Sequence, residues 1–195
     1  RRELRERREL ARRNVQYCCI AFMDLDHLKV INDTHGHAVG DLILTGAIEH
    51  VMQHLRPYDK IFRYGGDEFL LLLPGTELAD AEHLIERIRQ GFGKVPFVVS
   101  ADGHPIHATA SFGLATLDPE LIVEESIDRA DKAVLLAKAT GRDRACSWNP
   151  SVSAASFPFP DASRFSVRVL ERVARTARPR APPTCSEVFT SPDAR

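Results

Sequence analysis

Apolar and polar residues between positions 14 and 149 follow two different periods, which predict alternating strands and helices. The apolar run Tyr17–Met23 has the length of a buried strand and ends at Asp24. In residues 41–55, apolar side chains recur at the spacing of one helix face. The same two patterns predict strands at residues 17–23, 60–64, 69–73, 97–100, 106–114 and 144–148, and helices at 41–55, 76–90 and 122–140.

Turn residues between two of the predicted strands indicate a β-hairpin. Residues 60–64 and 69–73 flank Gly65-Gly66-Asp67-Glu68, in which the two glycines suit a tight turn. A second turn, at Asp102-Gly103, separates the strands at 97–100 and 106–114. Helices mixed with mainly antiparallel strands, without an internal repeat, predict an α/β sandwich built on a single sheet.

Composition changes near residues 148–150, where we expect the folded part to end. All 11 glycines lie at or before Gly141, whereas seven of the 12 prolines fall in residues 150–195. The change predicts an N-terminal linker or helix end at 1–13, one domain at 14–149, and a poorly ordered Pro-, Ser- and Arg-rich tail at 150–195. Within this tail, residues 165–176 have an amphipathic pattern that could form a short helix.

The net charge of −1 is the sum of an acidic centre and two basic ends. Residues 1–13 carry +4 and residues 150–195 carry +3, so the residues between them carry −8. An acidic domain argues against nucleic-acid binding, which needs a basic face to displace counterions, and it suits a protein that binds divalent cations.

Several other classes of protein are also disfavoured. No apolar run approaches the roughly 20 residues that a membrane span needs, and no signal segment opens the chain. The four cysteines lack the spacing of a zinc site, and the adjacent Cys18 and Cys19 lie in an apolar run. Packing thiols of this kind favour a reducing cytoplasm.

Carboxylates occur where the first strand ends and at the tip of the predicted hairpin. Asp24 and Asp26 end the buried strand, and Asp67 and Glu68 follow the hairpin glycines. If the two places are neighbours, their carboxylates can hold Mg²⁺, which usually binds one or two carboxylates together with substrate phosphates. Two simpler interpretations stay open: Gly-Gly-Asp-Glu is an ordinary turn, and Asp24 or Asp26 caps a following helix.

Three segments resemble, in order and in spacing, the motifs of the GGDEF domain, the diguanylate cyclase family. They are Phe22–Asp41, Arg63-Tyr-Gly-Gly-Asp-Glu-Phe69, and Ala130–Lys138 followed by Gly141-Arg142. The resemblance covers residues 17–148 and implies an α/β sandwich in which helices flank a central, mainly antiparallel sheet. It also implies that a homodimer in the bacterial cytoplasm condenses two GTP molecules into cyclic di-GMP and releases two pyrophosphates.

The resemblance assigns roles to residues of this chain position by position. It makes the carboxylates of Asp24 and Asp67 and the carbonyl of Leu25 the ligands of Mg²⁺, for which Mn²⁺ could substitute. Asp67, Glu68 and Lys29 become the catalytic groups: Asp67 accepts the proton of the ribose 3′-hydroxyl, and Lys29 stabilises transition-state charge. The implied substrate-binding residues are Asn32 and Asp41 at the guanine, His37 at a further position, and Lys138 and Arg142 at the β- and γ-phosphates.

Structural alternatives exist for several of these residues. Lys138 and Arg142 could simply interact with the negative end of a helix. His37 could be a core histidine bonded to backbone, and Asn32 could only terminate a short helix after Asp26.

A further motif precedes the hairpin. Arg56-Pro-Tyr-Asp59 has the form Arg-x-x-Asp, and five residues separate Asp59 from Gly65. In the family this placement marks the product-inhibition site that binds cyclic di-GMP, and Arg87 matches a second arm of that site in the next helix. The alternative is a surface ion pair worth less than about 1 kcal/mol.

The chain departs from the family pattern at its start and at a few single positions. The usual lead-in Asp-x-Leu-Thr-x-Leu-x-Asn-Arg-Arg is absent unless Arg1-Arg2 is its tail, so we expect that an N-terminal sensor or dimerisation module is missing. Leu28 replaces a common Phe, Leu136 a common Tyr or Ala, and Asp143 a common Asn.

The alternative function is a non-catalytic module that binds GTP or cyclic di-GMP and regulates a partner. Degenerate members of the family usually lose the hairpin acids. Asp67 and Glu68 are both present, which favours the enzyme.

Overall fold

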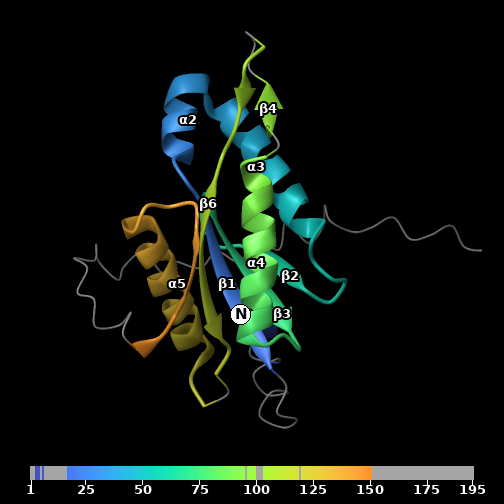
Figure 1. The fold of residues 1–195 in the computed structure, drawn as a ribbon, viewed down its shortest axis with the longest axis vertical. Helices are drawn as coiled ribbons and strands as arrows, with labels where there is room; N and C mark the ends of the chain where they lie inside the picture. The colour runs from blue at the N-terminus through green and yellow to red at the C-terminus, as the bar shows by residue number, and fades with distance from the viewer. Residues whose placement is uncertain are drawn as a thin grey trace, which may run out of the picture.

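The computed structural model describes residues 3, 4, 6, 17–94, 96–99, 103–118 and 120–150 (Figure 1). Five strands form the main sheet: β1 (Cys18–Leu25), β2 (Lys60–Arg63), β3 (Glu68–Pro74), β6 (Ala110–Thr116) and β7 (Ala145–Ser147). Two short strands, β4 (Val98–Val99) and β5 (Pro105–Ile106), form a separate sheet. The helices of the described part are α2 (Leu28–His35), α3 (His37–Met52), α4 (Leu78–Phe92) and α5 (Val123–Ala139).

β1 is the central strand of the main sheet, whose order is β2-β3-β1-β6-β7. It pairs antiparallel with β3 and with β6, and β2 also pairs antiparallel with β3. The β6–β7 pair is parallel. This arrangement confirms the predicted α/β fold with helices around a mainly antiparallel sheet.

Helices cover both faces of β1, and its side chains alternate between two apolar clusters. Cys19, Ala21 and Met23 belong to the cluster that includes α3 and α4, whereas Ile20 and Phe22 belong to the cluster that includes α5. A strand buried on both faces is apolar almost throughout instead of alternating with polar residues. This double burial is why the run at 17–23 could be recognised as a strand.

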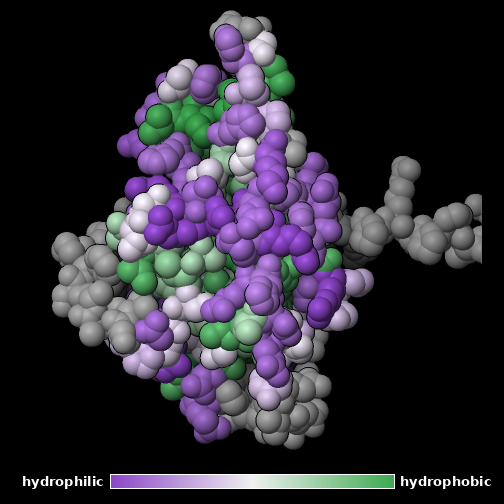
Figure 2. Space-filling view, viewed as in Figure 1, coloured by the Kyte–Doolittle hydropathy of each residue, from purple (hydrophilic) through white to green (hydrophobic). Residues whose placement is uncertain are grey.

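α4 shows the opposite pattern, because only one of its faces is covered. Ala81, Ile85, Ile88 and Phe92 are buried against the sheet. The outer face is hydrophilic, and Figure 2 shows hydrophilic side chains gathered over α4 at the front of the molecule. The apolar period of this segment therefore predicted its helical state.

The helices agree with the predictions to within a few residues, with one larger difference. The helix expected at 41–55 begins at His37 and ends at Met52. Gly36, with φ of 86°, separates it from α2, the short helix that follows Asp26. A glycine adopts this positive φ without the penalty that a side chain would bring.

The prediction of a single sheet with one strand at 106–114 is wrong. Ile106 ends β5 in the small sheet, and the main-sheet strand β6 begins only at Ala110 and runs on to Thr116. The backbone leaves the β5 pairing between these strands, where the Thr109 carbonyl accepts a hydrogen bond from the Asp26 amide over 2.9 Å. No glycine or proline marks this change of partner, so the apolar pattern continues across it.

The ends of the chain are described only in part. Leu4 is helical and buried in the cluster that includes α5. The predicted tail at 150–195, with the possible helix at 165–176, lies outside the described residues beyond Pro150. In the described ranges, no helix combines the length and the apolar character that a membrane crossing requires.

Candidate active site

The end of β1 and the tip of the β2–β3 hairpin lie side by side. Asp24 is the register partner of Glu68 across the β1–β3 pair. The Leu25 amide donates a hydrogen bond to the Asp67 carbonyl oxygen over 3.3 Å. The structure therefore brings together acidic residues that are far apart in the sequence, at one edge of the sheet.

Asp24 is a buried carboxylate in an electrostatically mixed environment. Only 5% of the residue is exposed, and its Oδ2 atom lies 2.5 Å from Lys138 Nζ on α5. Burial raises the pKa of Asp24 to about 6; the hydrogen bond and charge of Lys138 act in the opposite direction, and the charges of Asp67 and Glu68 raise the pKa further. Asp24 and Asp67 together carry one more negative charge than the Lys138 ammonium group balances.

This excess of negative charge fits a hard divalent cation. Among the described residues, no group of three or more His, Cys, Asp or Glu side chains is arranged to hold a metal ion by itself. Mg²⁺ does not require such a cage, because it usually binds one or two carboxylates and completes its shell with waters and substrate phosphates. Asp24, Asp67 and the Leu25 carbonyl supply oxygen atoms of the required kind at this edge.

Arg63 stabilises the hairpin tip from one side. Its Nε atom donates to the carbonyl oxygens of Gly65 and Gly66 over 3.1 and 3.0 Å, and its Nη2 atom donates to Gly66 over 2.5 Å. The Tyr64 and Gly65 amides donate to the Glu68 carbonyl over 2.8 and 3.2 Å. A Cβ atom on Gly65 would meet the carboxylate end of the Glu68 side chain, which would have to move aside. The predicted turn is confirmed, and its backbone is held independently of the acidic side chains.

Asp26 does not cap the following helix, contrary to one of the interpretations above. The N-cap of α2 is His27, with φ of 59° and no capping bond from its side chain. Asp26 is buried and accepts hydrogen bonds from the Thr109 hydroxyl over 2.8 Å, the Ser111 hydroxyl over 2.7 Å and the Asp143 amide over 3.1 Å. These bonds join β1 to β6 and to the turn after α5, next to Asp24.

α2 and α3 carry most of the residues expected at the guanine. The Asn32 side chain lies directly against Gly40, where a Cβ atom would clash with its carboxamide. The Asn32 Oδ1 atom is buried and has no hydrogen-bond partner among the described residues. His37 and Asp41 are exposed one helical turn apart on α3, and Lys29 is exposed on α2. Exposure of His37 excludes the alternative of a core histidine.

The end of α5 carries the two expected phosphate-binding cations. Lys138 lies in its last turn and pairs with Asp24, so it does more than complement the end of the helix. Arg142 is exposed and follows Gly141 in the turn after α5, with φ of 59°. Its amide donates to the Ala137 carbonyl over 2.9 Å, which closes the helix.

The Arg-x-x-Asp motif forms a tight turn before β2. Asp59 is 7% exposed, and its Oδ2 atom accepts a hydrogen bond from the Arg56 amide over 2.8 Å. Its Oδ1 atom is buried without a partner in the described part of the chain. Arg56 and Arg87 are exposed, and no hydrogen bond or ion pair joins Arg87 to the motif within that part. The Arg56 and Asp59 side chains form no ion pair in the described part of the chain; the Asp59 carboxylate accepts the Arg56 backbone amide instead.

One ion pair near the site could not be predicted from the sequence. Arg89 on α4 binds the Asp143 carboxylate, with 2.7 Å between Nη1 and Oδ1. In the sequence, Asp143 is notable only because it replaces the Asn that is common in the family, and Arg89 belongs to no motif. Only the fold shows that α4 and the turn after α5 are neighbours.

Comparisons with known proteins indicate the family to which this sequence and fold are similar. A sequence model of the diguanylate cyclase GGDEF domain matches residues 1–144. The chain is similar to the diguanylate cyclase DgcP of Pseudomonas aeruginosa, with 39% identity over 125 residues, which is 64% of this chain and 18% of DgcP. The chain thus spans less than a fifth of the length of that relative.

Solved structures resemble the fold as well. Diguanylate cyclase SiaD of Pseudomonas aeruginosa, solved in complex with its activator SiaC, gives a TM-score of 0.71 at 37% identity, over 75% of this chain and 55% of that chain. The GGDEF domain of DgcB from Caulobacter crescentus, in complex with c-di-GMP, gives a TM-score of 0.70 at 27% identity, over 74% of this chain and 85% of that chain.

Proposed function

The chain belongs to the GGDEF domain family of diguanylate cyclases, and from this premise we propose that it condenses two GTP molecules into cyclic di-GMP. In each of two equivalent steps, the 3′-oxygen of one GTP forms a bond to the α-phosphorus of the other. The bond between that α-phosphorus and the oxygen that bridges it to the β-phosphate breaks, and pyrophosphate leaves. The meeting of Asp24, Asp67, Glu68 and Lys138 at one edge of the sheet is the observation that carries this proposal.

Mg²⁺ is the ion that we propose for the site, with Mn²⁺ as a substitute. Asp24, Asp67 and the Leu25 carbonyl would hold it, and when bound it would neutralise phosphate charge and polarise the α-phosphorus. Asp67 accepts the proton of the attacking 3′-hydroxyl, with Glu68 beside it. Lys29, exposed on α2, stabilises the charge that develops as pyrophosphate leaves.

Guanine recognition is assigned to α2 and α3. The buried Asn32 Oδ1 atom lacks a partner among the described residues, and an N–H donor of guanine would satisfy it. Asp41 can accept from the N1–H and the exocyclic amine of the base, and His37 offers a further polar contact. Lys138 and Arg142 supply charge-assisted hydrogen bonds to the β- and γ-phosphates.

A homodimer follows from the symmetry of the product. Cyclic di-GMP is two-fold symmetric, and one site that binds one GTP has only half of the reactants. Two copies that face each other across a two-fold axis present both 3′-oxygens to both α-phosphates with one geometry. Such alignment of the reactants can supply about 7–11 kcal/mol of the barrier. A segment or module outside this chain would bring the two copies together.

Incubation with GTP and Mg²⁺, followed by separation of the nucleotides, tests the proposed function. The chain is assayed alone and fused to a dimerisation domain, because dimer formation is part of the proposal. Formation of cyclic di-GMP and pyrophosphate is expected. If the fused protein binds GTP but forms neither the cyclic product nor a linear intermediate, the proposed cyclase activity is wrong and the chain is a non-catalytic binding module.

Product inhibition is proposed for the turn that contains Arg56 and Asp59, together with Arg87. The exposed Arg56 side chain is available to a base or a phosphate, and the buried Asp59 carboxylate holds the turn through the Arg56 amide. Arg56→Ala is expected to raise the cyclic di-GMP concentration that halves the rate by roughly 10- to 150-fold, because one charged hydrogen bond contributes about 1.5–3 kcal/mol.

The inhibition is measured against the initial rate of each variant. Lys132→Ala removes a half-buried cation on α5, paired with Asp128, and serves as the control; its half-inhibitory concentration should stay that of the unsubstituted protein. An Arg56→Ala variant with unchanged product sensitivity would show that the motif is only a structural turn.

A further inference from the structure

The turn after α5 has an unusual backbone for its sequence. Arg142 and Asp143 both have positive φ, of 59° and 43°, although neither is glycine. The penalty of roughly 1–2 kcal/mol falls mainly on Arg142, because Asp adopts positive φ more readily than most residues. Contacts from other elements must therefore hold this turn in place.

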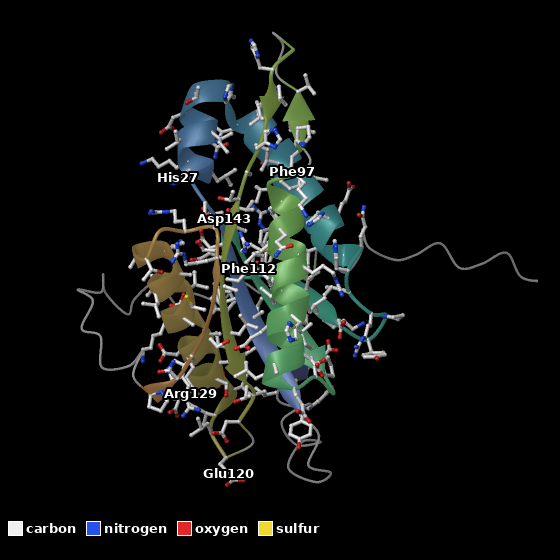
Figure 3. All side chains as sticks on the ribbon, viewed as in Figure 1. His27, Phe97, Phe112, Glu120, Arg129 and Asp143 are labelled. Carbon is white, nitrogen blue, oxygen red and sulfur yellow. The ribbon has the colours of Figure 1, made fainter. Side chains whose placement is uncertain are left out.

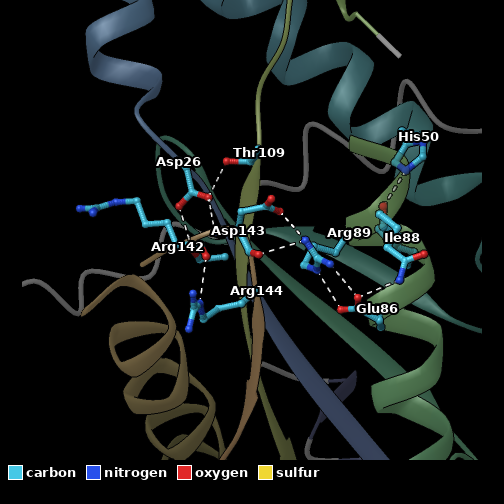
Figure 4. Close-up of polar contacts among 11 residues, drawn as sticks. Asp26, His50, Glu86, Ile88, Arg89, Thr109, Arg142, Asp143 and Arg144 are labelled. Atoms are coloured by element: carbon cyan, nitrogen blue, oxygen red, sulfur yellow. Dashed lines mark hydrogen bonds and ion pairs between the residues drawn. The ribbon is translucent and has the colours of Figure 1, made fainter. Parts of the chain in front are cut away.

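Arg89 on α4 provides one of these contacts. Its Nη1 atom donates to the Asp143 carbonyl oxygen over 3.0 Å and to the Asp143 carboxylate over 2.7 Å (Figure 4). Its remaining donors point to Glu86, with Nε–Oε2 at 2.8 Å and Nη2–Oε1 at 2.7 Å. Glu86 thereby orients the guanidinium group, which is only 20% exposed.

Asp26 holds the same turn from the opposite side. Its Oδ2 atom accepts the Asp143 amide over 3.1 Å, while the hydroxyls of Thr109 and Ser111 keep the carboxylate in position. Asp143 thus lies between α5 and α4, hydrogen-bonded to Asp26 directly after the strand that carries Asp24 (Figures 3 and 4). One chain of contacts runs from α4 through Asp143 to the metal-binding edge.

We propose that Arg89 and Asp143 are positioning residues for GTP: they hold the backbone turn that presents Arg142 to the triphosphate. The proposal rests on the proposed function, because it needs a phosphate at Arg142. The Arg142 side chain is exposed and extends away from Arg89 and Asp143 (Figure 4), so the network acts on its backbone and leaves its guanidinium group available. Without these contacts the backbone of the turn changes conformation, and the Arg142 guanidinium group is displaced with it.

The replacement of the common Asn by Asp at position 143 fits this role. Asn also tolerates positive φ and could accept one hydrogen bond from Arg89. A carboxylate accepts the same bond and also brings a negative charge opposite the guanidinium, so the contact becomes an ion pair. The contact in this chain is therefore a strengthened form of one that an amide can make.

The test uses two pairs of variants. Arg89→Ala and Asp143→Ala are each expected to raise the KM for GTP about 10-fold with a smaller change in kcat, and to weaken equilibrium binding of a non-hydrolysable GTP analogue equally. Asp143→Asn should recover most of the loss, because it keeps an acceptor for Arg89. Combining Arg89→Ala with Asp143→Ala should add little to Arg89→Ala alone, because Arg89→Ala already removes both hydrogen bonds from Arg89 to Asp143.

Lys132→Ala is the matched control, because it breaks the Lys132–Asp128 pair of 2.6 Å, which has comparable exposure on α5 but does not touch the turn. It should leave analogue binding unchanged. The proposal is overturned if Arg89→Ala binds the analogue as tightly as the unsubstituted chain, or if it lowers only the unfolding temperature. Failure of the cyclase activity itself appears instead as absent product in the unsubstituted chain, whereas the binding comparison remains valid.

Discussion

Asp67→Asn is expected to reduce the formation of cyclic di-GMP by more than about 100-fold under saturating GTP. Loss of a group that only orients a metal ligand costs about 10- to 100-fold, and Asp67 is proposed both to bind the ion and to accept the 3′-hydroxyl proton. The substitution should leave the hairpin intact, because Arg63 and the backbone carbonyls of Gly65, Gly66 and Asp67 hold it. Initial rates are measured over a series of Mg²⁺ concentrations with the dimerised protein.

The stability of the same variant provides the control. Its free energy of unfolding in urea should lie within about 0.5 kcal/mol of the unsubstituted value, as for most surface changes. Asp128→Asn, a carboxylate change on α5 outside the proposed site, should leave the rate unchanged. A rate within a few-fold of normal in Asp67→Asn would show that this carboxylate neither binds the ion nor takes the proton.

Asp24 is less suitable for this comparison. It is buried against Lys138, so Asp24→Asn would remove a metal ligand and also leave a partly buried ammonium group without its partner. Activity and stability would fall together. The half-buried Asp67 separates the two effects because its side chain makes no hydrogen bond or ion pair that the described structure records.

The sequence predicted the elements whose burial pattern is simple. β1 is covered on both faces and α4 on one, and each leaves a distinct apolar pattern. The proximity of the carboxylates at the end of β1 and at the hairpin tip could also be predicted, because the resemblance to known motifs assigns both to one metal site. The β1–β3 register then brought Asp24 opposite Glu68, as the proposed site needs.

Features that depend on tertiary contacts could not be predicted in the same way. The break between β5 and β6 occurs at His107–Thr109 without a turn residue, where Thr109 and Asp26 are joined by two hydrogen bonds. The sequence suggested Asp26 as a helix cap, because a helix follows it directly. Its three actual partners are far away in the sequence and could not be recognised from it. Arg89 and Asp143 lie on separate elements, so nothing local indicated their ion pair.

Gly113→Val is expected to destabilise the domain by about 3 kcal/mol, the upper part of the range for overpacked cores. Gly113 lies on β6 beneath α5, where a Cβ atom would come too close to the backbone of Ala130, Ala133 and Val134. These neighbours are main-chain atoms of a helix and cannot rotate away as a flexible side chain would. The helix would have to shift as a unit, which the free energy of unfolding in urea measures.

Gly93→Ala is the matched control. Gly93 ends α4 with φ of −77°, and a Cβ atom there meets no other described atom within 4 Å. Alanine at such a position should leave the domain as stable or stabilise it by about 0.4–1 kcal/mol, because the unfolded chain loses freedom. A Gly113→Val variant as stable as Gly93→Ala would mean that α5 does not rest directly on β6. Since that close approach places Lys138 beside Asp24, the electrostatic account of the site would fail with it.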